Sequence, residues 1–409
     1  MNSKLVLASL PFVMASTLAV ALPATDLVVQ AGGPPGTYPT VQAAIVAAQP
    51  GDRVLVMPGA YPAFSVTKAI SVYGMGTSSS DVVVAGVHFG LGFPNQGYRV
   101  SIARLRIDAG PLAPLAVTGQ ELGTGQIEFE SVEVFGGFRL LAGEPGFVLS
   151  LANCTVEGDV GQGFDGGTCH VAAPAPSTFT ITRSRFRGSR GDLFAAQAPL
   201  AALVLDRGAT VRIEQCSLSG GEGGVAQAGA PGLHVRLAQV KSLGGGSSVY
   251  GGNGGSGAAG GPGVKTTSTV FRGTATVVGG IGAPNGPIVA GGGSLLATAA
   301  GSPELVFLVD QTQNGPVVVR AGTDLEWHLA SSLPGVVLMS PILQSPLPAP
   351  YDSLVVAPAT ALFLPVDAAF AMPSLGDLRG LPLFFQGVAI DAANGAYPAT
   401  AAFAIHVDG

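Results

Sequence analysis

Hydrophobic and polar residues follow a ten-residue frame that recurs seven times between residues 100 and 273. Frame positions 1 and 3 are apolar in nearly every copy, position 5 is polar, positions 6 and 8 are small or apolar, and position 10 is usually glycine. The copies begin at Val100, Ile127, Leu149, Phe179, Val211, Val235 and Val264. A repeat that buries its side chains only against its neighbours predicts the stacked coils of a β-solenoid.

The individual frame positions predict how each coil turns. Position 5 is polar in all copies, which predicts a corner between two strands: Arg104, Ser131, Asn153, Arg183, Gln215, Gln239 and Ser268. Position 8 is expected to point inward, at Ile107, Val134, Val156, Phe186, Leu218, Ser242 and Phe271. Glycine at position 10 suits a turn with positive φ. Because the copies begin 22 to 32 residues apart, we expect long loops to leave the core between strands.

The segment before the repeats predicts one short helix and two strands. Thr40 is an N-cap for a helix over residues 41–48, whose apolar residues share one face. Pro50-Gly51 ends this helix. Residues 54–56 and 70–72 predict strands.

Four segments of this region carry a resemblance to a known superfamily: TVQAAI (40–45), GDRVLV (51–56), PGAY (58–61) and ISVYG (70–74). They resemble the opening of pectin-lyase-like right-handed parallel β-helix proteins. The resemblance implies that fold, with the short helix covering the hydrophobic end of the first coil. The superfamily includes lyases, hydrolases, esterases, epimerases, phage tailspikes and non-catalytic surface proteins. The aspartate and arginine motifs of polygalacturonases and pectin methylesterases are absent, and Pro62-Ala63 replaces an acidic residue often found after this opening.

The two ends of the chain differ from the repeats. Lys4, an apolar run at residues 5–18 and the small-residue pattern at residues 19–21 predict a signal peptide over residues 1–21. The run is short for a bilayer and Pro11 and Pro23 interrupt it, so we expect a secreted or cell-surface protein whose mature chain has no membrane span. The β-helix is expected over residues 25–298. Apolar runs separated by turn residues predict an antiparallel β-sandwich over residues 303–409.

Composition removes some classes of function. The net charge of −6 and the low charged fraction of 11% give no basic surface for nucleic acid. Cys154 and Cys216 occupy frame position 6 two copies apart, which places their sulfurs about 10 Å from each other, too far for a disulfide. Cys169 is expected in a loop, paired with Cys154 or free.

A set of cations is the main candidate for ligand binding. Arg212, Arg236 and Lys265 occupy frame position 2 in three consecutive copies, where side chains point outward. Arg185 and Lys241 occupy position 7, and Arg183 and Arg187 lie beside them. A row of cations at strand spacing suits the carboxylates of an acidic polysaccharide. The alternative is a solvated sheet face without a ligand.

The candidate metal ligands are aspartates in the loops around these cations. Asp159, Asp165 and Asp192 offer the oxygen atoms that calcium takes. The histidines are scattered without metal spacing. The glycine-rich residues 244–263 lack regularly placed aspartates and predict a flexible loop.

Three functions follow from these patterns. The first is non-catalytic binding of a polysaccharide or cell-surface polymer, with no cofactor. The second is a polysaccharide lyase or glycoside hydrolase acting on acidic polysaccharide, in which Arg183, Arg185 and Arg212 face the substrate and calcium serves if the enzyme is a lyase. The third is a structural component of the cell envelope. No residue is identified as catalytic, because fold alone does not imply function.

Overall fold

The structure is a computed structural model of the chain. It describes residues 24–90, 97–111, 113, 115–159, 162–163, 165–192, 197–244, 246–267, 269–272, 275–291, 294–297, 304–307, 318–320, 324–330, 335–340, 361–364, 367–371, 382–390 and 403–408. The predicted signal peptide lies outside the described residues.

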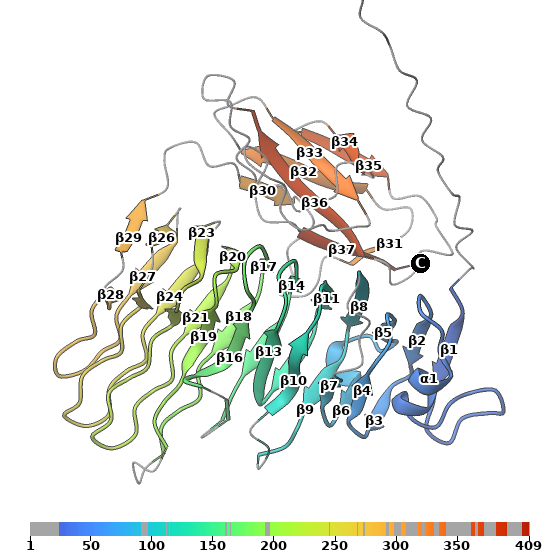
Figure 1. Ribbon diagram of the computed structural model, residues 1–409, viewed down its shortest axis with the longest axis horizontal. Helices are drawn as coiled ribbons and strands as arrows, with labels where there is room; N and C mark the ends of the chain where they lie inside the picture. Colours follow the sequence, from blue (N-terminus) through green and yellow to red (C-terminus); the bar gives the residue numbers. More distant parts are fainter. Residues whose placement is uncertain are drawn as a thin grey trace, which may run out of the picture.

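Three long sheets of parallel strands form most of the molecule (Figure 1). Within the described residues, the first sheet has eleven strands in the order β1 (Asp26–Val29), β2 (Arg53–Val56), β5 (Ser71–Gly74), β8 (Tyr98–Ala103), β11 (Gly125–Glu130), β14 (Val148–Ala152), β17 (Thr178–Thr182), β20 (Thr210–Glu214), β23 (Gln239–Gly244), β26 (Thr269–Arg272) and β29 (Ser294–Ala297). The second has nine: β3 (Gly59–Tyr61), β6 (Val82–Val84), β9 (Arg106–Asp108), β12 (Glu133–Phe135), β15 (Thr155–Glu157), β18 (Arg185–Arg187), β21 (Ser217–Ser219), β24 (Ser248–Tyr250) and β27 (Thr276–Val278).

The third sheet also has nine described strands: β4 (Phe64–Val66), β7 (Val87–Phe89), β10 (Leu115–Leu122), β13 (Gly137–Ala142), β16 (Gly167–Ala172), β19 (Ala201–Asp206), β22 (Leu233–Val235), β25 (Val264–Thr266) and β28 (Val289–Ala290). From β2 onward the chain visits the first, second and third sheets in turn. The predicted β-solenoid of stacked parallel strands is confirmed. The expectation of long loops between the copies is wrong, because these segments contain the third sheet.

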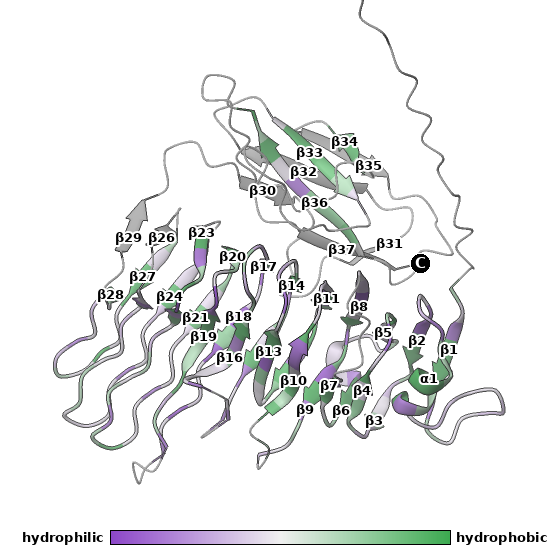
Figure 2. Cartoon of the chain, viewed as in Figure 1, coloured by the Kyte–Doolittle hydropathy of each residue, from purple (hydrophilic) through white to green (hydrophobic). Residues whose placement is uncertain are grey.

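The first five copies of the ten-residue frame have the predicted register. Val100, Ile127, Leu149, Phe179 and Val211 are consecutive partners in the first sheet, and all five are fully buried. The predicted inward position 8 is confirmed for the same copies, from Ile107 to Leu218 in the second sheet. Burying each large apolar side chain stabilises the fold by about 1.5–3 kcal/mol, so these ladders hold the coils together. Figure 2 shows the hydropathy of every described residue on the same view.

The frame predicts that its sixth and seventh copies continue the first sheet, and this prediction is wrong. Val235 and Val264 lie in the third sheet, and Val211 pairs instead with Val240, which pairs with Val270. The second-sheet positions assigned to Ser242 and Phe271 belong to Val249 and Val277. A register shift between Val211 and Arg212 displaces the pattern by one residue in β23. Since every strand alternates with period two, β22 and β25 fit the same apolar frame as β23 and β26.

The polar corner column is confirmed for these first five copies. Arg104, Ser131, Asn153, Arg183 and Gln215 each follow a first-sheet strand and have left-handed backbone, with φ between 47° and 57°. The assignment of Gln239 to this column is wrong, because Gln239 begins β23. Ser268 lies outside the described residues.

The cysteines lie in the core as free thiols. Cys154, Ser184 and Cys216 form a single file: the Cys154 N–H donates to Ser184 Oγ at 3.0 Å, and the Ser184 N–H donates to Cys216 Sγ at 3.5 Å. The predicted absence of a Cys154–Cys216 disulfide is confirmed. Cys169 lies in the buried strand β16 and not in a loop, because its side chain belongs to the inward row of the third sheet.

The glycine-rich residues are ordered, which corrects the expectation of a flexible loop. We call residues 220–232, 251–263 and 279–288 the glycine layer; they connect the second sheet to the third and lie side by side at the lower left of Figure 1. Backbone hydrogen bonds of 2.8 Å run from Gly280 to Gly261, from Gly261 to Gly252 and from Gly252 to Ala230. A Cβ atom at Gly255 would overlap the carbonyl of Gly224, so glycine is required for chains to pack this closely.

Helix α1 (Val41–Ala47) confirms the predicted helix, and a short 3-10 helix, η1 (Ser79–Asp81), precedes β6. The Thr40 hydroxyl accepts a hydrogen bond from the Ala43 N–H at 3.2 Å, as an N-cap does. Val41, Ala44 and Ile45 are buried, and the helix contacts β1, β2 and β4.

The C-terminal residues form two further sheets. One consists of β30 (Glu304–Phe307), β32 (Asp324–Ala330) and β35 (Asp367–Ala371), all antiparallel. The other has the order β31 (Val318–Arg320), β37 (Phe403–Asp408), β36 (Pro382–Ala389), β33 (Gly335–Ser340) and β34 (Leu362–Leu364), and its pairs are antiparallel except β31 with β37.

Most outward side chains of β8 to β20 in the first sheet are buried, and the C-terminal strands lie above these strands in Figure 1. The Arg99 guanidinium lies 5.6 Å from the centre of the Phe384 ring, which joins the two parts. Glu128, Thr180 and Arg212 point outward from this sheet and are at most 5% exposed. Frame position 2 therefore points outward as predicted, but it does not face solvent in these strands.

Candidate functional site

A column of basic side chains lies on the outer face of the third sheet. Successive strands pair Arg139 with His170, His170 with Val204, Val204 with His234, and His234 with Lys265. The residues on either side of each are buried in the core, so these five point outward. We call Arg139, His170, His234 and Lys265 the basic column. Neighbouring strands place its members about 4.8 Å apart per strand.

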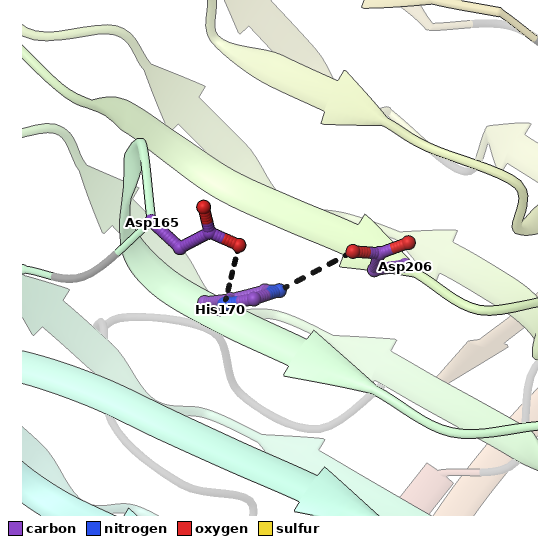
Figure 3. Close-up of side chains that lie close together, drawn as sticks. All are labelled: Asp165, His170 and Asp206. Carbon is purple, nitrogen blue, oxygen red and sulfur yellow. Dashed lines mark ion pairs between the residues drawn. The ribbon is translucent and has the colours of Figure 1, made fainter.

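Two aspartates flank His170 (Figure 3). Asp165 lies in the turn before β16 and is exposed, and Asp206 is the last residue of β19. The Asp165 Oδ2 atom lies 3.9 Å from His170 Nδ1, and the Asp206 Oδ2 atom lies 3.8 Å from His170 Nε2. Both distances exceed hydrogen-bond length.

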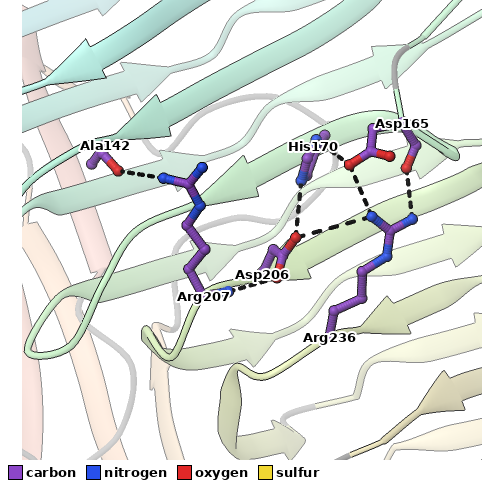
Figure 4. A network of polar contacts seen from close by, with 6 residues as sticks. All are labelled: Ala142, Asp165, His170, Asp206, Arg207 and Arg236. Carbon is purple, nitrogen blue, oxygen red and sulfur yellow. Dashed lines mark hydrogen bonds and ion pairs between the residues drawn. The ribbon is translucent and has the colours of Figure 1, made fainter.

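Arg236, which directly follows β22, joins the two aspartates (Figure 4). Its Nη1 atom lies 2.9 Å from Asp165 Oδ2 and 4.0 Å from Asp206 Oδ2, and its Nη2 donates to the Asp165 carbonyl at 2.7 Å. Asp206 is held from its other side, because the Arg207 N–H donates to Asp206 Oδ1 at 2.8 Å. We call Asp165, His170, Asp206 and Arg236 the Asp-His-Asp cluster.

Burial keeps both histidines of the site neutral near pH 7. It is the largest cause that lowers the pKa of His170, against the opposing effect of Asp165 and Asp206. Burial, followed by the nearby charges of Arg236 and Lys265, lowers the pKa of His234 to about 4. The side chains that carry positive charge here at neutral pH are therefore the arginines and Lys265.

A hollow of about 450 Å³ lies beside the cluster. Its polar lining includes Gln227, His234, Arg236 and Lys265, and its remaining walls are small apolar and glycine residues of the glycine layer and of the turns before β16 and β19. Two cations on small apolar walls suit a ligand with carboxylate groups.

A second hollow, of about 420 Å³, lies over the second sheet. It is lined by Asp108, Phe135, Glu157, Asp159, Arg187 and Arg190, among others. Arg190 of this lining lies 3.6 Å from Asp159, and Glu157 lies 3.8 Å from Arg185. The lining holds three carboxylates and two guanidiniums, which makes this hollow less suited to an anion than the first.

The structure distributes the predicted ligand-binding cations over all three sheets. Arg212 and Lys241 belong to the first sheet, where Arg212 is buried and the side chain of Lys241 lies outside the described residues. Arg183 stands at the corner and donates to Gln215 Oε1 at 3.1 Å, and Arg185 and Arg187 lie on the second sheet. Only Arg236 and Lys265 of the predicted set share the hollow beside the basic column. The predicted row of Arg212, Arg236 and Lys265 is wrong because its frame crossed from one sheet to another.

The three calcium candidates are separated as well. Asp159 pairs with Arg190 over the second sheet, and Asp192 Oδ1 accepts from the Gln197 N–H at 3.2 Å. Among the described residues, the group that brings three metal-ligand side chains together is Asp165, His170 and Asp206. The expectation of long loops between the copies, with Cys169 in one of them, hid the strand that carries His170. Alternation in GTCHVA (167–172), with Cys169 and Val171 inward, is the signal that identifies His170 as outward.

The stacked strands define the class of the protein as a parallel β-solenoid. Comparison with protein-family models, with curated proteins and with solved structures finds no match for the chain. In the part of the chain that the structure describes, no helix has the length and apolar character needed to cross a membrane.

Proposed function

We propose that the protein is an exported parallel β-helix that binds an anionic polysaccharide or cell-envelope polymer along the basic column, without catalysing a reaction. The observation that carries this proposal is the alignment of Arg139, His170, His234 and Lys265 in one outward row of the third sheet, beside a hollow that also holds Arg236.

The repeat spacing supports a polymer as the ligand. An acidic polysaccharide carries carboxylates at regular intervals, and the strands of a solenoid present side chains at regular intervals of about 4.8 Å. Exposed Lys265 offers a mobile point charge for a carboxylate, and Arg236, whose two Nη atoms contact Asp165, adds positive charge at the wall of the hollow. The neutral imidazole of His234 adds a hydrogen-bonding group between these cations.

The finer description of the fold is part of the proposal. The resemblance of residues 40–74 to pectin-lyase-like proteins supports a right-handed helix closed at its first coil by α1, which contacts β1, β2 and β4. The two C-terminal sheets touch through β30 with β36 and β32 with β33, which supports a β-sandwich. The apolar N-terminal run with its small-residue site supports export to the medium or the cell surface.

The lyase or hydrolase alternative has weaker support. It needs acid, base or cationic groups that converge over one accessible groove. Arg183, Arg185 and Arg212 lie at a corner, on the second sheet and beneath the C-terminal sheets, respectively, so they do not face one substrate. The three aspartates proposed as calcium ligands have different partners: Asp159 contacts Arg190, Asp165 contacts Arg236, and Asp192 accepts from Gln197.

The experiment is retention of the purified protein on immobilised polygalacturonate and alginate, with neutral dextran as reference. We expect retention on the acidic matrices that weakens with salt. Lys265→Glu is expected to abolish binding to the acidic matrices. Arg185→Glu, which makes the same change of charge on the second sheet, is expected to bind as the parent protein does. Equal loss in both variants would contradict the basic column, and release of unsaturated uronate products would contradict the non-catalytic function.

A further inference from the structure

His170 is a buried polar side chain whose position is not explained by hydrogen bonding. It is 3% exposed, and within the described part of the chain neither of its ring nitrogens has a hydrogen-bond partner. A polar group buried without a partner is destabilising, so native structures seldom contain one without a reason.

The groups around His170 are those of a metal site. One ligand atom from each of Asp165, His170 and Asp206 lies within 4.8 Å of the others. The carboxylates of Asp165 and Asp206 lie beside the two ring nitrogens and also contact the guanidinium of Arg236. A bound cation would supply the missing partner of the imidazole.

We propose that Asp165, His170 and Asp206 bind a divalent transition-metal ion of the zinc type. One imidazole nitrogen and two carboxylate oxygens are a ligand set that zinc accepts, whereas calcium takes oxygen ligands alone. Bonds of about 2.0–2.2 Å in tetrahedral geometry place donor atoms roughly 3.3–3.6 Å apart. The 3.9 and 3.8 Å distances run to different ring nitrogens, whereas an ion coordinates only one of them, so the relevant limit is the 4.8 Å within which one donor atom of each residue lies. Binding therefore requires both carboxylates to move inward around one nitrogen, and Asp165 Oδ2 to exchange part of its contact with Arg236 for the ion.

Arg236 acts in this site as a positioning residue. It holds Asp165 through both the carboxylate and the backbone carbonyl, as outer hydrogen-bond partners of metal ligands do. Three protein ligands leave a coordination position open, and Arg236 also lines the neighbouring hollow. The metal site does not depend on the proposed binding of a polymer.

The test is titration of untagged, EDTA-treated and dialysed full-chain protein with ZnCl₂ in an isothermal calorimeter, with CaCl₂ in a parallel experiment. We expect one Zn²⁺ ion per chain and preference for Zn²⁺ over Ca²⁺. Asp206→Asn and His170→Gln are expected to weaken Zn²⁺ binding at least about tenfold. His234→Gln, on the same sheet but outside the cluster, and Asp192→Asn, a carboxylate elsewhere, are expected to bind as the parent protein does.

Three results would overturn the proposal: absence of Zn²⁺ binding, preference for Ca²⁺, or unchanged Zn²⁺ affinity in folded Asp206→Asn. Circular dichroism establishes the folded state of each variant. If His170→Gln does not fold, Asp206→Asn decides alone, because Asp206 lies at the end of its strand and asparagine keeps the oxygen that accepts from the Arg207 N–H.

Discussion

At the scale of single residues, burial on the outer face of the first sheet changes the pKa of the Glu130 carboxyl group. It is 2% exposed; its Oε1 atom accepts from Asn153 Nδ2 at 2.6 Å and from Ser131 Oγ at 3.2 Å, and its Oε2 atom has no hydrogen-bond partner among the described residues. Burial, outweighing these hydrogen bonds, raises the pKa of Glu130 from 4.5 to about 8. The carboxyl group is therefore protonated in the folded protein at neutral pH.

We predict that Glu130→Gln removes a pH-dependent loss of stability. Between pH 4.5 and 8 the folded state binds a proton that the unfolded chain has released, so stability falls as pH rises through this window. The variant lacks the buried charge, and its free energy of unfolding relative to the parent is expected to rise by about 1–3 kcal/mol from pH 5 to pH 9. Urea denaturation at both pH values measures this difference. Parallel stability curves would contradict the buried position of Glu130.

The corner column gives a second prediction at this scale. Gln215 has a φ of 53°, a conformation that β-branched residues strongly disfavour and asparagine tolerates. Gln215→Val is expected to lower the free energy of unfolding by about 1–2 kcal/mol. Gln215→Asn, which keeps an amide near Arg183, is the matched control and is expected to change it by less than half as much in the same denaturation experiment.

At the scale of elements, the solenoid joins two kinds of repeat. The strands are stabilised by stacked apolar ladders, whereas the glycine layer is stabilised by backbone hydrogen bonds between connections that have almost no side chains. The layer also supplies small walls to the hollow beside Arg236 and Lys265. Its close packing has a direct structural cause, since a Cβ atom added at Gly229, Gly255 or Gly261 would meet the backbone of a neighbouring connection.

We predict that the glycine layer is intolerant of even one methyl group. Gly255→Ala is expected to lower the free energy of unfolding by about 1–3 kcal/mol, because the new Cβ atom overlaps the backbone of Gly224. Gly143→Ala is the control, since the nearest atom outside its chain neighbours lies at 3.6 Å, an ordinary contact. Thermal denaturation of the two variants checks the contrast; equal melting temperatures would show that the layer contributes no packing constraint.

At the scale of the whole molecule, Arg99 connects the solenoid to the C-terminal sheets. Its Nε atom lies 3.0 Å from Glu128 Oε1, and its guanidinium faces the Phe384 ring. Burial raises the pKa of Glu128, and the charge of Arg99 acts in the opposite direction. Outward side chains of the first sheet such as Glu128 and Arg212 are buried, whereas the basic column lies on the third sheet and includes exposed Lys265.

We predict that Arg99→Met destabilises the molecule in a pH-dependent way. Arg99 is 31% exposed and Glu128 is buried, so losing Arg99 is expected to cost about 1–3 kcal/mol at pH 8, where Glu128 would have to remain charged or bind a proton. At pH 4 the Glu128 carboxyl is protonated and the cost is expected to be smaller. Adding Glu128→Gln is expected to restore most of the loss at pH 8. A pH-independent loss in urea denaturation would contradict the role of the ion pair.

The sequence by itself determined the parts of this protein that depend on local periodicity. The ladders from Val100 to Val211, the left-handed corners and the capped helix follow from alternation, polarity and a single Thr40 hydroxyl, all of which act within one coil. The file of Cys154, Ser184 and Cys216 follows because equal positions of successive coils stack.

Only the tertiary structure decided which sheet each later strand joins and which side chains meet. Val235 and Val264 belong to the third sheet, and no local pattern distinguishes their strands from those of the first sheet because all alternate with the same period. The meeting of Asp165, His170, Asp206 and Arg236, residues up to 71 positions apart, depends on the pairing of three coils and on the turn before β16. Covering of the first sheet by distant C-terminal strands likewise arises from packing, so the sequence pattern identified outward residues but not which of them reach solvent.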